Sequence, residues 1–186
     1  MIHGLNIIEN FINDEEHSTL ISEIDKSPWL TDLKRRVQHY GFKYDYSARR
    51  INPSMYVGCL PDWTQDIQKR LKEIVPHFAP DQLIINEYNP GQGISGHVDC
   101  ETCFTNTIIS LSLGSGCEIE FINCKTHTIH KYYIRQKSLL IFSDEARYNW
   151  KHRIRGRKTD MLNFVKIYRT RRVSLTFRKV ILDESL

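Results

Sequence analysis

A strictly alternating segment near the C-terminus runs Arg172-Val173-Ser174-Leu175-Thr176-Phe177-Arg178. Because successive side chains of a β-strand point to opposite faces, the pattern predicts one apolar face and one face with two arginines and two hydroxyl groups. A strand on the surface would show the same pattern. If the strand is buried, however, its arginines are costly unless anions neutralise them, and the segment then predicts a site for an acidic ligand.

A second segment with even spacing, His97-Val98-Asp99, places an imidazole and a carboxylate on one face. His152 is the best candidate for a third ligand. Two histidines and one carboxylate on one side of Fe(II) leave three open positions, two for a bidentate oxo-acid and one for O2. The His-x-Asp pair alone is a weak signal, because a surface turn can carry the same residues.

The residues before His97 strengthen the hypothesis of a metal site. Asn86 and Tyr88 are two positions apart and can share a face, and Pro90, Gly91 and Gly93 form a turn that can direct His97 inward. Arginine binds carboxylates in a bidentate manner. We therefore expect an iron site beside a pocket for a small dicarboxylate.

The order of predicted elements indicates an α+β fold. A capping box at Asn13 opens a helix that extends to about Lys26, and a second helix follows Pro61. Between them, residues 34–51 mix basic and aromatic side chains, and the alternation of Phe42, Tyr44 and Tyr46 favours a hairpin or an extended flap. Six short strands are predicted at 82–88, 105–113, 117–123, 128–134, 137–142 and 170–181. Helices followed by many short strands favour a jelly roll (a double-stranded β-helix).

We expect a single domain over 1–186, with helices and flap at about 1–80 and the jelly-roll core at about 81–182. No apolar stretch reaches the roughly 18 residues of a membrane span. The N-terminus lacks the features of a secretory signal. We therefore expect an intracellular protein, in the cytoplasm or nucleus, without membrane contact and as a monomer.

Basic residues are unevenly distributed along a chain whose net charge is only +4. The segment from Arg147 to Arg172, both included, contains ten Lys or Arg and a single acid, Asp160, and a further cluster is Lys34-Arg35-Arg36. This pattern is typical of a surface that binds phosphates. The alternative is the solvated face of a mildly basic enzyme.

Five cysteines in an intracellular chain are expected to be reduced thiols. Cys100 and Cys103 form a Cys-x-x-Cys pair directly after Asp99. A zinc site completed by Cys117 and Cys124 is the alternative to free thiols, but those two are not a second close pair.

The ordered motifs resemble those of the AlkB family of Fe(II)- and 2-oxoglutarate-dependent dioxygenases. The matching positions are Asn86-x-Tyr88-x-x-Gly91-x-x-Ile94-x-x-His97-x-Asp99, His152 and Arg172-x5-Arg178. The likeness extends over about residues 30 to 181 and is strongest to the oxygenase domain of members that hydroxylate the wobble uridine of tRNA. It implies Fe(II) as cofactor with 2-oxoglutarate and O2 as cosubstrates.

The resemblance also implies a role for each matching residue. His97, Asp99 and His152 would bind the iron, and Arg172 the distal carboxylate of 2-oxoglutarate. The other cosubstrate residues would be Asn86, Tyr88, Ser174, Thr176 and Arg178. Substrate contacts would come from Glu101, Arg35, Arg36 and Tyr44.

One position departs from the pattern of the DNA-repair members. Arg35 or Arg36 stands where those members have a tryptophan that stacks on the damaged base. Trp29, further upstream, is the alternative source of such a ring.

The leading hypothesis is a dioxygenase that oxidises nucleic acid, by hydroxylation of a modified tRNA base or by demethylation of alkylated bases in DNA or RNA. Aromatic side chains interleaved with arginines in the flap favour this substrate class, because they supply stacking and phosphate contacts. A protein hydroxylase or demethylase of the same superfamily is the first alternative. A non-catalytic nucleic-acid-binding jelly roll is the second.

Overall fold

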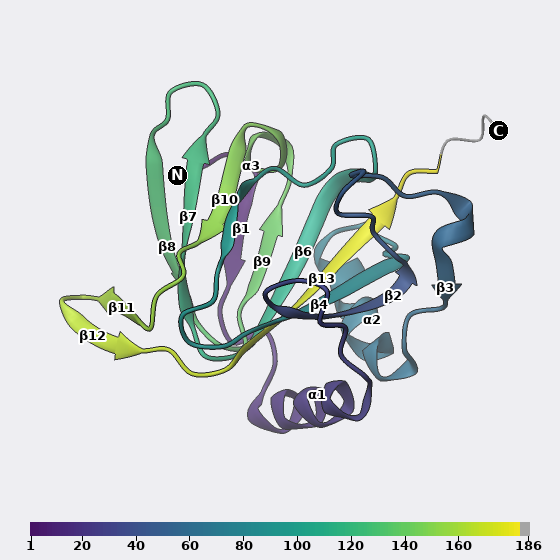
Figure 1. The fold of residues 1–186 in the computed structure, drawn as a ribbon, viewed down its shortest axis with the longest axis horizontal. Helices are drawn as coiled ribbons and strands as arrows, with labels where there is room; N and C mark the ends of the chain where they lie inside the picture. The colour runs from purple at the N-terminus through teal and green to yellow at the C-terminus, as the bar shows by residue number, and fades with distance from the viewer. Residues whose placement is uncertain (183–186) are drawn as a thin grey trace.

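The computed structural model describes residues 1–182, which form two facing β-sheets, a projecting hairpin and short helices (Figure 1). The larger sheet contains β1 (Leu5–Ile8), β9 (Leu139–Phe142), β6 (Phe104–Gly114), β13 (Arg172–Val180), β4 (Gln82–Tyr88), β2 (Arg36–Phe42) and β3 (Tyr56–Gly58), in that spatial order. The smaller sheet has the order β5 (Ile94–His97), β10 (Trp150–Ile154), β7 (Cys117–Asn123) and β8 (Ile129–Ile134). The hairpin consists of β11 (Thr159–Leu162) and β12 (Val165–Tyr168).

The alternating segment forms β13, between β6 and β4 in the larger sheet. Val173, Leu175 and Phe177 are fully buried in the core on one side. The register aligns Ser174 with Asn86 on β4, so residues from several strands share the opposite, polar face. Both faces of β13 are covered, and the predicted division into an apolar and a polar face is confirmed.

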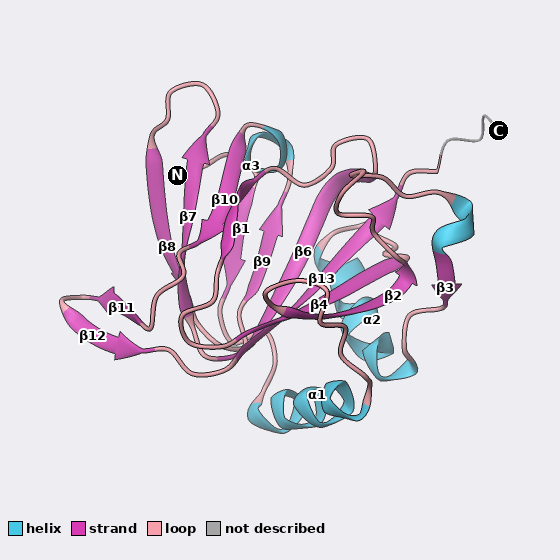
Figure 2. Ribbon diagram, viewed as in Figure 1, coloured by secondary structure: helices cyan, strands magenta, loops and turns pink. Residues whose placement is uncertain are grey.

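Helices cover the apolar face of the larger sheet, as Figure 2 shows. α1 (Asp14–Lys26) begins at Asn13, where the predicted capping box with Glu16 is present. α2 (Gln65–Ile74) follows a 3-10 turn at Asp62–Thr64. Each helix buries two apolar side chains against the sheet, namely Leu20 and Ile24 of α1 and Ile67 and Leu71 of α2. Burial of such side chains contributes about 1.5–3 kcal/mol each.

All six predicted strands are present, but the sequence did not reveal β1, β3, β5, β10, β11 and β12. Most of these strands are short and do not alternate cleanly. α3 (Asp144–Tyr148) and the 3-10 turn at Pro53–Met55 were also not predicted. Among the described residues, no helix is long and apolar enough to cross a membrane.

Candidate active site

A cavity of about 500 Å³ lies between the two sheets and is lined by both of them and by the flap. The larger sheet supplies the polar face of β13 and Asn86 and Tyr88 of β4, and the smaller sheet supplies His97 and His152. Residues from distant parts of the sequence therefore meet in one pocket, whose volume suits a small ligand and part of a substrate.

Strand pairing positions the two histidines of the predicted metal site. β5 and β10 are antiparallel, and His97 is directly opposite His152 in their register. The imidazole centroids are 4.3 Å apart. Asp99 follows β5 by two residues, and its Oδ1 lies 3.6 Å from Nε2 of His97. Ligating atoms of the three residues all lie within 4.8 Å of one another.

The protonation states of these residues suit a metal ion. His97 Nδ1 lies 2.8 Å from the backbone oxygen of Ser95, and donation of its proton there leaves Nε2 free to bind a metal. Burial, with the nearby His97 and Arg178, lowers the pKa of His152 to about 3. Burial acts to raise the pKa of Asp99, but Arg178 and both histidines hold it well below its usual value. A neutral His152 and an ionised Asp99 are the forms that bind metal, so the donor set fits Fe(II).

Two buried arginines lie on the polar wall of the cavity. Arg172 donates from Nη2 to Ser112 Oγ at 2.9 Å, and its Nε has no partner among the described residues. Arg178 lies nearer the predicted metal site, with Nη2 3.4 Å from Asp99. An unpaired buried guanidinium N–H costs about 1–3 kcal/mol, and a carboxylate of a bound dicarboxylate would remove that cost at Arg172. Ser174 and Thr176 line the cavity between these arginines.

A sequence model described as the 2OG-Fe(II) oxygenase superfamily matches residues 31–178. The chain belongs to this superfamily. The oxygenase is 37% identical, over 98% of its length, to the uncharacterized protein L905 of Acanthamoeba polyphaga mimivirus and spans 88% of it. It is 35% identical over 96% to the alkylated DNA repair protein ALKBH8 homolog of Arabidopsis thaliana. With the tRNA (carboxymethyluridine(34)-5-O)-methyltransferase alkbh8 of Xenopus tropicalis it shares 34% identity over 95%.

The oxygenase spans 59% of the length of the Arabidopsis relative and 32% of the Xenopus one. Its fold matches the solved structure of OsALKBH1 with a TM-score of 0.72 over 95% of this chain and 96% of that one, at 18% sequence identity. These likenesses identify an AlkB-like dioxygenase with a jelly-roll fold, which confirms the fold class and the family expected from the motifs.

The alternation of β2 separates the expected substrate residues of the oxygenase. Arg35 precedes the strand on the cavity side, where its Nε donates to Asn86 Oδ1 at 2.7 Å. Arg36 points to the other face and forms an ion pair with Glu87. The guanidinium of Arg36 lies 4.9 Å from the ring centroid of Trp29. Neither Arg36 nor Trp29 lines the cavity.

Two further expected substrate residues are placed differently from each other. Tyr44 lines the cavity and packs against Phe104 and Tyr46. Glu101 is exposed on the turn after Asp99 and does not line the cavity. Of the four expected substrate residues, Arg35 and Tyr44 are therefore within reach of a bound ligand.

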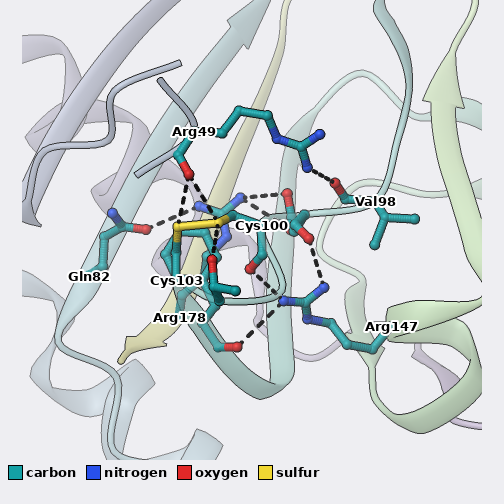
Figure 3. The surroundings of a disulfide bond; sticks show 10 residues. Arg49, Gln82, Val98, Cys100, Cys103, Arg147 and Arg178 are labelled. Atoms are coloured by element: carbon teal, nitrogen blue, oxygen red, sulfur yellow. Dashed lines mark hydrogen bonds and ion pairs between the residues drawn. A yellow bond between two sulfur atoms is a disulfide. The ribbon is translucent and has the colours of Figure 1, made fainter. Parts of the chain in front are cut away.

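Arg147 of α3 holds the segment that carries Asp99 (Figure 3). Its guanidinium donates to the backbone oxygens of Asp99 at 3.0 Å, Cys100 at 2.8 Å and Phe104 at 3.5 Å. No sequence pattern assigns Arg147 this role, because its partners are backbone atoms that any residue could supply. Ser112 was missed for a similar reason, since an alternating serine in a strand is common.

The expectation of reduced thiols is wrong for Cys100 and Cys103, which form a disulfide. The tight turn after Asp99 brings their side chains together, and both sulfur atoms lie close to the backbone oxygen of Arg49 in the flap (Figure 3). Cys59, Cys117 and Cys124 are free. Within residues 1–182, the triad at His97 is the one cluster with three possible metal ligands, so the structure gives no support to a zinc site at Cys100 and Cys103.

Five of the ten basic side chains from Arg147 to Arg172 form internal ion pairs. Glu120 binds Arg153 and Arg155, while the buried Asp160 binds Arg157 and Arg169. Other partners bind Arg147 and Arg171, and Arg172 faces the cavity. The excess of positive charge in this segment is thus largely structural. The three lysines Lys151, Lys158 and Lys166 form no ion pair with the described residues.

Proposed function

We propose that this dioxygenase oxidises bases of nucleic acid, either by hydroxylating a modified tRNA base or by demethylating an alkylated base in DNA or RNA. The observation that supports it best is the composition of the cavity. Two imidazoles and a carboxylate converge at one end of the cavity, and the buried, incompletely paired Arg172 lines it from the larger sheet. Fe(II) with 2-oxoglutarate and O2 supplies the oxidising chemistry of the family.

In this proposal, the residues of the cavity have distinct roles. His97, Asp99 and His152 would hold the iron, and Arg172 would bind the distal carboxylate of 2-oxoglutarate. Tyr88, buried beside Arg172 with its ring centroid 5.5 Å from the guanidinium, and Asn86 would hydrogen-bond the cosubstrate. Arg178 keeps Asp99 ionised.

The rim of the cavity favours a planar, anionic substrate. Tyr44 and Tyr46 pack edge to face there, and Lys34, Arg35 and Arg49 also line the cavity. Aromatic rings next to cations are suited to unpaired bases and their phosphates. The names of the Arabidopsis and Xenopus relatives, which refer to alkylated DNA and to tRNA, support the same substrate class.

The test is a turnover assay with protein purified without oxygen and then given Fe(II), 2-oxoglutarate and air. We expect succinate release that increases with total tRNA or with a methylated oligonucleotide. Formaldehyde indicates demethylation, and a hydroxylated nucleoside without formaldehyde indicates hydroxylation. His152→Ala is the inactive control.

Two outcomes would contradict the proposal. Stimulation of succinate release by protein substrates but not by nucleic acid would favour a protein hydroxylase. Nucleic-acid binding without turnover would favour a non-catalytic module. We also propose that the protein is a monomer, which sedimentation tests, and that it lies inside the cell, which fluorescent tagging tests.

A further inference from the structure

The β11–β12 hairpin is a separate small sheet that projects from the body of the molecule (Figure 1). Its root is rigid, because the buried carboxylate of Asp160 accepts hydrogen bonds from Arg169 at 2.6 and 2.7 Å and from Arg157 at 2.8 Å. Arg169 also donates to the backbone oxygen of Arg155 at 2.8 Å. A firmly anchored hairpin with a free tip is a typical way to present side chains to a partner.

The root of the hairpin adjoins the rim of the cavity. Ile154, at the end of β10, lines the cavity, and the hairpin begins five residues later at Thr159. The backbone N–H of Gly91, in the turn before β5, donates to the oxygen of Arg157 at 3.2 Å. A polymer that inserts one unit into the cavity would therefore pass near this hairpin.

The exposed side chains of the hairpin are mainly apolar. Phe164, at the tip, is 99% exposed, and Tyr168 is 70% exposed. The register pairs Thr159 with Tyr168 and Met161 with Lys166, so these four residues share the face opposite the buried Asp160. Met161 and Val165 are exposed as well, and exposed apolar side chains gathered on one small element mark an interaction site more often than single ones do.

The charged residues of the hairpin indicate which class of partner it could bind. Lys158 and Lys166 are exposed and form no ion pair with the described residues, and the ammonium of Lys166 lies 5.5 Å from the ring centroid of Tyr168. Asp160 is the one acid in the hairpin, and it is buried and neutralised. Rings and cations without exposed acids complement bases and phosphates.

We propose that the β11–β12 hairpin is a docking surface for single-stranded nucleic acid. Phe164 and Tyr168 stack on unpaired bases beside the nucleotide that enters the cavity, and Lys158 and Lys166 bind the adjacent phosphates. This inference rests on the proposed function and deepens it, because it names the surface that holds the substrate strand outside the active site.

The test measures binding directly and needs no turnover. The probe is a fluorescein-labelled single-stranded RNA of about 12 nucleotides, within the usual range of site sizes, titrated with the full chain in an anisotropy assay. We expect Phe164→Ser and Tyr168→Ser each to weaken binding by about tenfold, as loss of one stacked base predicts. Lys166→Gln is expected to reduce the slope of log K against log salt by about 0.7.

The matched control is Val57→Ser, which removes an exposed apolar side chain from β3, at the opposite end of the molecule (Figure 1). It should bind the RNA like the wild type. Equal binding by wild type and the Phe164→Ser, Tyr168→Ser double variant overturns the inference. It is also overturned if sedimentation shows that the wild type self-associates through Phe164 while RNA affinity does not depend on it.

Failure of the inference can be told apart from failure of the proposed function. If RNA binding depends on the hairpin but no nucleic acid is oxidised, the docking surface stands and the substrate assignment is wrong. If a methylated oligonucleotide is oxidised and its affinity is insensitive to both aromatic substitutions, the proposed function stands and the docking surface is wrong.

Discussion

One step along the chain separates a structural arginine from a proposed ligand-binding one. Arg171 precedes β13 and pairs with Asp25 and Glu87 on the outer side. Arg172 faces the cavity and leaves its Nε unpaired. We predict that Arg172→Lys raises the KM for 2-oxoglutarate by about ten- to hundredfold, because hydrogen bonds to a charged partner contribute about 1.5–3 kcal/mol.

Arg171→Lys is the matched control, since it makes the same chemical change at the neighbouring position. Its KM for 2-oxoglutarate should stay close to that of the wild type, measured by succinate release under identical iron and oxygen. Equal effects of both substitutions, or no effect of either, would show that Arg172 does not bind the cosubstrate.

A second prediction at the scale of the residue concerns His39 on β2. Burial, followed by repulsion from Arg178 and Lys43, lowers its pKa to about 4. Its Nδ1 has no hydrogen-bond partner among the described residues. Between about pH 6.5 and 4 the unfolded chain binds a proton there that the folded chain does not. Folding stability must therefore fall as the pH falls through this window, by up to about 1.4 kcal/mol per pH unit.

His39→Gln should reduce this slope, because glutamine does not titrate. The measurement is urea unfolding of wild type and variant at pH 7 and pH 4.5. Since all other titrating groups are shared, the difference between the two proteins isolates His39. Parallel pH profiles would falsify the assigned pKa.

At the scale of elements, α3 acts as a clamp on the turn that carries Asp99. Arg147 is buried and binds three backbone oxygens of that turn and the start of β6. We predict that Arg147→Leu lowers the free energy of unfolding by about 2–4 kcal/mol, because the carbonyls lose their donors in a buried place. It should also weaken Fe(II) binding, measured by anaerobic titration, since Asp99 loses its fixed position.

The control for Arg147 is Arg155→Leu, which removes a half-exposed guanidinium paired with Glu120. Because the buried Glu120 keeps Arg153 and Lys131 as partners, loss of this half-exposed guanidinium should cost about 1 kcal/mol, and Fe(II) affinity should not change. If Arg147→Leu unfolds at the same urea concentration as Arg155→Leu, the hydrogen bonds of Arg147 do not stabilise the fold as predicted.

The turn between Asp99 and β6 supports a redox prediction. Because Cys100 and Cys103 form a disulfide whereas Cys59, Cys117 and Cys124 do not, denatured but unreduced protein should titrate three thiols. Prior reduction should raise the number to five. Five thiols without reduction would mean that the pair is not oxidised, as the composition alone had suggested.

Local patterns explain which elements the sequence could predict. β13 and α1 were predictable, because alternation and a capping box are properties of adjacent residues. β5 and β10 were not, since Ile94–His97 is only partly buried and has a single apolar residue. The pairing of these two strands nevertheless brings His97 beside His152. The triad itself could be predicted only because residue types and the family resemblance identified it.

At the scale of the whole molecule, the basic composition predicted a larger phosphate-binding surface than the sheet topology leaves free. Ion pairs of Glu120 and Asp160 neutralise four of the arginines that were expected to meet phosphates. No local pattern shows which acid will meet which base across the smaller sheet. The cations of residues 147–172 still available to a ligand are Arg172 at the cavity, Lys151 and the lysines Lys158 and Lys166 of the hairpin, which is a narrower surface than the sequence indicated.

The position of the cavity between the two sheets leads to a prediction for the whole molecule. Ligands that bind only the folded state stabilise it, by about 2.7 kcal/mol at a concentration roughly one hundred times Kd. We therefore expect Fe(II) with 2-oxoglutarate, without oxygen, to raise the Tm by about 5–10 °C in a chain of this size. Both sheets supply cavity residues, so near- and far-ultraviolet circular dichroism should report one shared transition. His152→Ala should fold but show a much smaller shift, and an equal shift in the variant would mean that the ligands bind elsewhere.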